Sequence, residues 1–202
     1  MRLLFGLIPY GAVAIGLYAL SSGWAAIGLY HLAAIAAMAL AGYRQKDARL
    51  FSGWSAALGL PLAALCFGGC LLLYVLWPLI RLEGLALDRA LLSLGLSGAA
   101  WWAFIPYYTL VNPVVEELFW RGFLGSDSTR PTLADVLFAG YHALVLATFM
   151  PWYVNAAEVL GLVFVAWIWR QLARRNGGLA IPLATHAAAD LGIILASHLV
   201  AN

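Results

Sequence analysis

Seven residues in an otherwise apolar part of this sequence have side chains that could do chemistry together. They form three motifs with the patterns Glu-Glu-x-x-x-Arg, Phe-x-x-x-His and His-x-x-x-Asp, made of Glu116, Glu117, Arg121, Phe138, His142, His186 and Asp190. A charged side chain in the centre of a bilayer costs about 3 kcal/mol or more, so such residues are usually paired or functional. Carboxylates and imidazoles are also the groups that activate water. The motifs therefore predict an enzyme whose active site lies within the membrane.

The first motif predicts one ion pair and one free carboxylate. Adjacent residues on a helix point in different directions, so Glu116 and Glu117 are not expected to face the same spot. Glu117 and Arg121 have the i, i+4 spacing in the favourable order, which leaves Glu116 to face the interior of the bundle. Pro113 disturbs the helix just upstream. A charge cluster that ends a span at the membrane interface is the alternative interpretation.

The second motif places His142 one helical turn after Phe138, inside a predicted span. The span has a typical helix start, in which Thr132 caps the first turn and Asp135 occupies the third helical position. A lone histidine in a span is often a packing residue, and this alternative stays open for His142. His31, in an earlier apolar stretch, is interpreted in that way and is given no role.

The third motif places His186 and Asp190 on one face of the last predicted span, because they are spaced i, i+4. Pro182 lies one turn earlier, where it removes a backbone hydrogen bond and can kink the helix. Gly177 and Gly178 mark the loop before this span. Taken alone, the pair could also be a proton relay or an ion site.

The composition is that of a membrane protein. Of the 202 residues, 64% are hydrophobic and 10% are charged, and the mean hydropathy is +0.90, whereas soluble domains have about 25% charged residues. Apolar runs of about 20 residues predict an all-α membrane bundle of about seven transmembrane helices rather than a β-barrel. The predicted spans cover residues 3–20, 24–43, 58–80, 97–115, 132–151, 154–170 and 179–199.

We expect one integrated membrane domain with two parts. Residues 1–96 supply N-terminal helices and, over 81–96, an amphipathic surface helix or linker, whereas residues 97–202 form the core that holds the motifs. The net charge of +2 is too small to indicate a nucleic-acid partner. Cys66 and Cys70 are interpreted as small apolar residues of a helix, because no further metal ligands lie near them in the sequence.

The arginines indicate how the chain crosses the membrane. Most of them fall at Arg2 and in the segments 44–49, 121–130 and 170–175, and only Arg81 and Arg89 would lie on the opposite side. The positive-inside rule then places the N-terminus in the cytoplasm, for a multi-pass protein of the cell inner or plasma membrane. In this orientation the three motifs fall in the cytoplasmic half of the bilayer.

In this order, EELFWRG, FAGYH and HAAAD resemble the motifs of the CPBP family, which comprises CAAX-type and bacteriocin-processing intramembrane proteases and is also called the Abi family. The resemblance covers roughly residues 97–199 and suits a compact bacterial member. It implies that Glu116 activates the attacking water with His142 beside it. It also implies that Glu117 and Arg121, with Phe138, hold the geometry of the pocket.

The resemblance further implies that His186 and Asp190 stabilise the oxyanion or position the water. Asp190 stands where many family members have asparagine. Because a carboxylate cannot donate a hydrogen bond unless it is protonated, we expect Asp190 to orient His186 instead.

The implied function is an intramembrane endopeptidase that hydrolyses a membrane-associated protein or peptide, such as a prenylated tail, a leader or a C-terminal sorting segment. We expect a glutamate mechanism without a cofactor. Zinc held by the two histidines and carboxylates is the alternative, although the zincin pattern His-Glu-x-x-His is absent. The other function classes are a non-catalytic scaffold or bacteriocin immunity factor, and a transporter, whose polar residues should cross the whole membrane. The sequence gives no oligomeric state.

Overall fold

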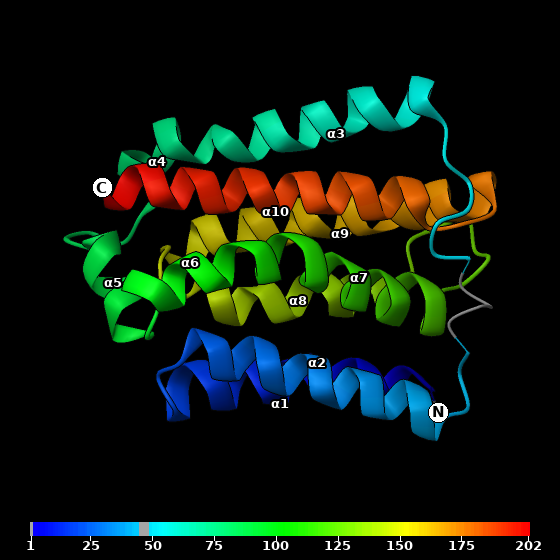
Figure 1. Ribbon diagram of the computed structural model, residues 1–202, viewed down its shortest axis with the longest axis horizontal. Helices are drawn as coiled ribbons and strands as arrows, with labels where there is room; N and C mark the ends of the chain where they lie inside the picture. Colours follow the sequence, from blue (N-terminus) through cyan, green and yellow to red (C-terminus); the bar gives the residue numbers. More distant parts are fainter. Residues whose placement is uncertain (1, 45–48) are drawn as a thin grey trace.

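The computed structural model describes residues 2–44 and 49–202, and in this part of the chain every regular element is a helix. Figure 1 shows the long helices side by side along the long axis of the molecule, which confirms the predicted all-α bundle. The helices are η1 (Arg2–Leu7), α1 (Ile8–Ala14), η2 (Ile15–Ala19), α2 (Gly23–Leu40), α3 (Ala56–Leu71), α4 (Leu73–Ile80), α5 (Leu87–Ser93), α6 (Gly98–Pro106), η4 (Tyr107–Val111), α7 (Asn112–Glu116), η5 (Glu117–Phe123), α8 (Leu133–Leu146), α9 (Trp152–Asn176) and α10 (Ala180–Ala201).

Five or six candidate spans replace the seven that the sequence predicted. In the described residues, five helical stretches are long and apolar enough to cross a membrane: Arg2–Ala19, Gly23–Leu40, Ala56–Ile80, Trp152–Asn176 and Ala180–Ala201. A sixth requires α5 and the run Gly98–Phe123 together, and these are bent by 90°. The predicted span over 132–151 is helical only in α8, whose 14 residues cover about 20 Å of a hydrocarbon core about 30 Å thick.

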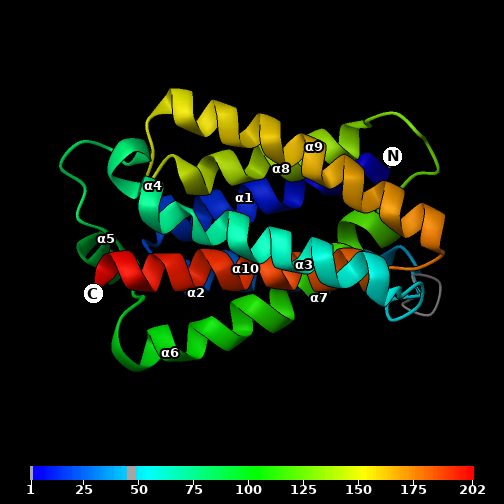
Figure 2. The same ribbon diagram turned by 90° about the horizontal axis from the view of Figure 1, so that it is seen from above.

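The segments that carry most of the arginines gather at one end of the bundle. Figure 1 shows the N-terminus at this end, and with it the connections from η5 to α8 and from α9 to α10. The connection from α4 to α5 and the C-terminus lie at the opposite end, and Figure 2 agrees. The predicted basic loop 44–49 joins α2 to α3, but its residues 45–48 lie outside the described residues.

α3 lies at one side of the bundle, against α10 (Figure 1). The two helices approach closely at Gly192, where an added Cβ would lie 2.6 Å from the backbone oxygen of Phe67 and 2.9 Å from Cβ of Cys70. Real Cβ atoms do not come so close to backbone atoms, so only glycine allows this separation. The position of α10, which carries the third motif, therefore depends on Gly192.

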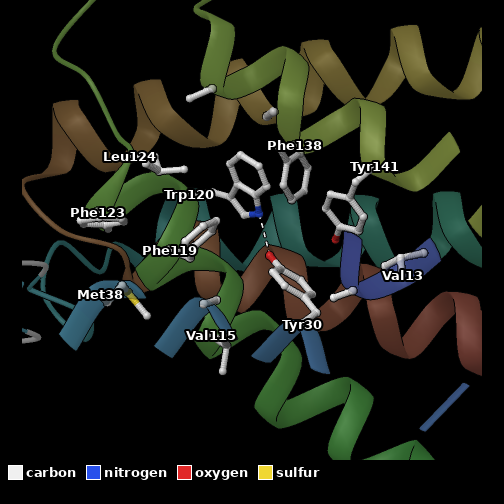
Figure 3. Packing of buried hydrophobic residues seen from close by; sticks show 14 of the residues in the cluster. Val13, Tyr30, Met38, Val115, Phe119, Trp120, Phe123, Leu124, Phe138 and Tyr141 are labelled. Carbon is white, nitrogen blue, oxygen red and sulfur yellow. Dashed lines mark hydrogen bonds between the residues drawn. The ribbon is translucent and has the colours of Figure 1, made fainter. Parts of the chain in front are cut away.

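The interior is filled by two apolar clusters. The larger one joins α1, α2, η5, α8 and α9, and its most buried large side chains are Phe119, Trp120 and Phe138. Figure 3 shows these rings packed around one another, with Tyr30 of α2 and Tyr141 of α8 beside them. The second cluster includes Trp77 and Phe104 and lies between α4, α5, α6 and the end of α10. The helices of residues 1–96 thus pack directly on those that carry the motifs.

The segment between η5 and α8 is held by Arg170 of α9. Its guanidinium pairs with Asp135 at 2.8 Å and donates to the backbone oxygens of Ser126 and Arg130 at 3.1 and 2.7 Å. Asp135 also accepts a hydrogen bond from the backbone N–H of Thr132 at 2.8 Å. This confirms the predicted helix start and fixes how α8 enters the bundle.

Candidate active site

The first motif lies where a helix changes its hydrogen-bond pattern. α7 ends at Glu116, and the next residue, Glu117, begins the π-helical turn of η5. Pro113 occupies the first turn of α7, where its missing N–H is tolerated. π-helical turns are rare, occur mostly as single turns inside α-helices, and are frequent at functional sites. Both glutamates are fully buried at this junction.

Glu116 has one carboxylate oxygen with a hydrogen-bond donor and one without. The hydroxyl of Tyr141 donates to Oε1. Oε2 lies 3.3 Å from Nε2 of His186, yet it forms no hydrogen bond within the described residues. Oε2 of Glu117 is likewise buried without a hydrogen-bond partner. A buried acceptor without a donor is costly, so Oε2 of Glu116, which faces His186, is suited to bind an incoming donor.

The predicted ion pair between Glu117 and Arg121 is present. Oε1 of Glu117 and Nη1 of Arg121 are 3.2 Å apart, and both side chains are buried. Cζ of Arg121 also lies 4.0 Å from the ring centroid of Phe138 and 5.0 Å from that of Trp169. A guanidinium over an aromatic face is attracted by the ring electrons. The phenylalanine of the second motif therefore contacts the arginine of the first.

His186 contacts both carboxylates of the first motif, a contact that the spacing of the residues did not predict. Nδ1 lies 2.9 Å from Oε1 of Glu117, and Nε2 lies 3.3 Å from Oε2 of Glu116. The nitrogens of an imidazole lie on different edges of the ring, so one histidine can contact two carboxylates at different positions. The ring also stacks on Trp169, with centroids 4.6 Å apart. The ring carries a hydrogen on both nitrogens only as the imidazolium.

Asp190 shares a face of α10 with His186, as predicted, but its hydrogen-bond partner is Asn112. Oδ1 of Asp190 lies 3.7 Å from Nε2 of His186. Oδ2 accepts a hydrogen bond of 3.0 Å from Nδ2 of Asn112, and all three side chains are buried. The carboxylate of Asp190 is thus anchored on one oxygen and faces the histidine with the other.

His142 lies at the edge of this group. Its Nδ1 is 2.8 Å from the backbone oxygen of Phe138, and its ring packs against the rings of Phe138 and Tyr141 with centroids 4.9 and 4.1 Å away. A carbonyl oxygen only accepts, so Nδ1 carries the hydrogen and Nε2 of the neutral ring is an acceptor. Contacts thus connect all seven predicted residues, with His142 joined to the others through Phe138.

Several residues of the site were not predicted from the sequence. Tyr141 binds Glu116, Asn112 binds Asp190, and Trp169 stacks on His186. Tyr30 accepts a hydrogen bond of 2.7 Å from Nε1 of Trp120 beside them, as Figure 3 shows. The one available signal was position, because Tyr141 directly precedes the histidine of the second motif.

The side chains of the site that could bind zinc face one another or backbone oxygens. Within the described residues, no group of three or more His, Cys, Asp or Glu side chains is placed to hold a metal ion. Both nitrogens of His186 face carboxylates, and Nδ1 of His142 faces a carbonyl oxygen. A catalytic zinc needs three protein ligands that converge on one point, and these side chains contact one another instead.

Comparison with known proteins points to the part of the chain that holds the three motifs. No curated protein and no solved structure matches this chain. The sequence model of one family, described as type II CAAX prenyl endopeptidase Rce1-like, matches residues 98–192, a range that holds all seven residues of the three motifs. That family indicates an intramembrane protease of the CAAX type. Over residues 98–192, the match confirms the resemblance to the CPBP family of intramembrane proteases that the three motifs indicated.

Proposed function

We propose that this chain is an intramembrane endopeptidase in which Glu116 is the general base. The observation that carries the proposal is the buried Oε2 of Glu116, which has no hydrogen-bond donor and lies 3.3 Å from Nε2 of His186. A water molecule donating to this oxygen would lie beside both a base and an imidazole. That is the arrangement in which a carboxylate removes a proton from water during attack on a carbonyl.

The reaction begins when Glu116 takes a proton from water and the resulting hydroxide attacks the carbonyl carbon of the peptide. The carbonyl oxygen becomes an oxyanion, which Nε2–H of His186 stabilises. Nε2 of His142 accepts a hydrogen bond from the other hydrogen of the water and so sets the orientation of the water. When the carbon–nitrogen bond breaks, Glu116 returns the proton to the leaving amine, so that one water is consumed for each peptide bond hydrolysed.

Glu117, Arg121 and Phe138 have a positioning role in this proposal. Glu117 holds Nδ1 of His186 at 2.9 Å and is itself paired with Arg121 at 3.2 Å. Phe138 covers the guanidinium of Arg121. This series keeps a hydrogen on Nδ1 of His186 and fixes the plane of the ring, so that Nε2 points toward Glu116.

Asp190 orients His186 in the proposed mechanism and does not itself bind the oxyanion. Its Oδ2 already accepts from Asn112, and its Oδ1 faces Nε2 of His186 at 3.7 Å. A carboxylate so placed stabilises the imidazolium form of His186 by charge. It offers no hydrogen to an oxyanion.

The mechanism that we propose uses no metal ion. The hydrogen bonds of His186 with Glu117 and of Asn112 with Asp190 support this choice, because they occupy atoms that a metal ion would need as ligands. In the zinc-dependent alternative the same carboxylates and imidazoles would have to separate and turn toward a common point.

An apolar substrate segment is supported by a groove beside the site. The groove has a volume of about 400 Å³ and lies between the segment before α3, the η4–α7 run and α10. Its wall includes Val114, two residues before Glu116, and Ala187, next to His186. We propose that the substrate is a membrane-associated protein or peptide, such as a bacterial leader or C-terminal tail, and that it is cut in the cytoplasmic half of the inner or plasma membrane.

The proposal is tested by cleavage of a panel of membrane-anchored peptides with purified protein in liposomes. Glu116→Gln keeps the shape of the side chain and removes the base, so we expect cleavage to fall by a factor of about 100 or more. Glu158→Gln is the matched control, because Glu158 is an exposed glutamate of α9 outside the site.

Both variants and the unchanged protein are assayed with and without a strong zinc chelator. Loss of cleavage in Glu116→Gln alone supports a glutamate mechanism. Loss with the chelator, restored by zinc, would overturn the metal-free mechanism. Equal cleavage by Glu116→Gln and the unchanged protein would remove Glu116 from the reaction, and absence of cleavage of every peptide would favour a non-catalytic scaffold or immunity factor.

A further inference from the structure

His31 of α2 lies outside the region that matches the protease family, yet both of its ring nitrogens form hydrogen bonds with side chains of that region. It is 2% exposed. Nδ1 lies 2.8 Å from the hydroxyl of Tyr107, and Nε2 lies 3.0 Å from Oδ1 of Asn112. Nδ2 of Asn112 then donates to Oδ2 of Asp190 at 3.0 Å. We propose that His31 is a positioning residue of the active site, which acts on Asp190 through Asn112; this inference rests on the proposed function.

Tyr107, His31, Asn112 and Asp190 form a series of hydrogen bonds. The direction of each bond follows from the carboxylate of Asp190, at which the series ends. The carboxylate of Asp190 accepts, so the amide NH₂ of Asn112 faces it and Oδ1 of Asn112 faces His31. Oδ1 only accepts, so Nε2 of His31 carries a hydrogen. Nδ1 of the neutral ring is then the acceptor for the hydroxyl of Tyr107. All three donors in the series point toward Asp190.

The series holds Asp190 in place and does not conduct protons. A side-chain amide such as that of Asn112 has no readily exchanged proton to pass from its oxygen to its nitrogen, so no proton crosses from His31 to Asp190. What the series transmits is orientation. Asn112 keeps its amide hydrogen aimed at Oδ2 only while its oxygen is held by His31, and Oδ1 of Asp190 is thereby kept facing His186.

The same series explains why histidine is placed in the middle of an apolar helix. Any other side chain at this position of α2 would have to reach Oδ1 of Asn112 and donate a hydrogen bond to it. His31 also stacks on Tyr107, with centroids 5.5 Å apart and ring planes 28° from parallel. If His31 served only for packing, phenylalanine could replace it, so a phenylalanine variant separates a packing role from a positioning role.

The test compares His31→Phe with His31→Gln in the peptide cleavage assay. Phenylalanine keeps a ring and removes both nitrogens, whereas glutamine keeps an amide N–H that can donate to Oδ1 of Asn112. We expect His31→Phe to lower kcat about 10- to 100-fold with KM little changed, as for other residues that orient a reacting group without contacting the substrate. His31→Gln should recover much of that loss. His198→Phe is the matched control, because His198 lies near the far end of α10 and bonds Trp101 and Asn202 rather than Asp190.

A double variant tests whether His31 acts through Asn112. If it does, His31→Phe with Asn112→Ala should lose no more kcat than Asn112→Ala alone, since residues in one network are not additive. Additive losses would overturn the connection. Equal kcat in His31→Phe and the unchanged protein, or equal losses in the Phe and Gln variants, would overturn the positioning role.

A spectroscopic measurement keeps this inference separate from the proposed function. Nitrogen-15 NMR of the imidazoles in the unchanged protein should show His31 neutral, with the hydrogen on Nε2, and Asn112→Ala should shift the Nε2 signal. This result would support the network even if no peptide were cleaved. A hydrogen on Nδ1 of His31, or an unchanged spectrum in Asn112→Ala, would contradict it.

Discussion

Arg121 is held by three neighbours, and this distinguishes it from an ordinary surface arginine. Its guanidinium pairs with Glu117 and lies over the rings of Phe138 and Trp169, and 8% of the residue is exposed. Removal of one partner of a buried ion pair leaves the other charge without compensation. The pair therefore matters more to folding than its Coulomb energy alone would indicate.

Arg121→Ala is expected to destabilise the protein by about 3–5 kcal/mol, because Glu117 loses its cation in an apolar setting. The stability of Arg121→Lys should fall between those of the unchanged protein and Arg121→Ala, since lysine keeps the charge but not the planar stacking. The measurement is folded yield after extraction and Tm in detergent, with Arg175→Ala, at the exposed end of α9, as control. Unchanged yield and cleavage in Arg121→Ala would rule out the orienting pair.

At the residue scale, local spacing was predicted well and contacts between distant elements were not. The pair Glu117–Arg121 follows from i, i+4 spacing within one helix, and the common face of His186 and Asp190 follows in the same way. The double contact of His186 depends on where α10 meets the junction of α7 and η5, which no spacing encodes. Asn112 and His31 were missed because a single polar residue in an apolar stretch has no partner in its own helix.

At the element scale, the apolar pattern predicted where the helices lie in the sequence but not how far each one extends across the membrane. α8 was expected to span 132–151, but it ends at Leu146 because a turn occupies the residues before Pro151. The run from α6 to η5 includes two π-helical turns, and hydropathy cannot detect a change in hydrogen-bond pattern. Yet the change places Glu117 next to a helix junction, where the site is built.

Gly192→Ala is expected to lower stability, because its Cβ would lie 2.6 Å from the backbone oxygen of Phe67 and α3 would have to move away from α10. Overpacking of this kind costs about 1–3 kcal/mol. The matched control is Gly161→Ala in α9, where an added Cβ meets no atom within 4 Å. There the better helix propensity of alanine should leave Tm unchanged or slightly higher. Equal Tm changes in the two variants would show that α3 and α10 are not closely packed at this position.

At the scale of the whole molecule, the site is built from both parts of the chain. The matched region 98–192 supplies the seven motif residues, whereas α2 contributes Tyr30 and His31 to the surrounding network. The apolar cluster around Trp120 likewise includes residues of α1 and α2. The N-terminal helices therefore act as more than a membrane anchor for the core, since they contact the groups that hold the motif residues.

The two ends of the bundle differ in charge, and this difference predicts how the protein lies in the membrane. The end with the N-terminus also carries the connections from η5 to α8 and from α9 to α10, whose neighbouring residues include Arg130, Arg174 and Arg175. Arginines concentrate on the cytoplasmic side of inner and plasma membranes. We expect this end to be cytoplasmic and the connection from α4 to α5 to face the outside.

Single cysteines introduced at exposed positions of the two ends test this orientation. Cys66→Ala and Cys70→Ala first remove the native thiols, and Asp127→Cys and Glu83→Cys then place one thiol at each end. A membrane-impermeant maleimide added to intact cells should label Glu83→Cys, and it should label Asp127→Cys only after the membrane is permeabilised. The reverse pattern would place the arginine-rich end outside and move the proposed cleavage to the outer half of the bilayer. Labelling of both positions in intact cells would contradict the bundle as a spanning unit, because Asp127 and Glu83 belong to connections at opposite ends of the same helices.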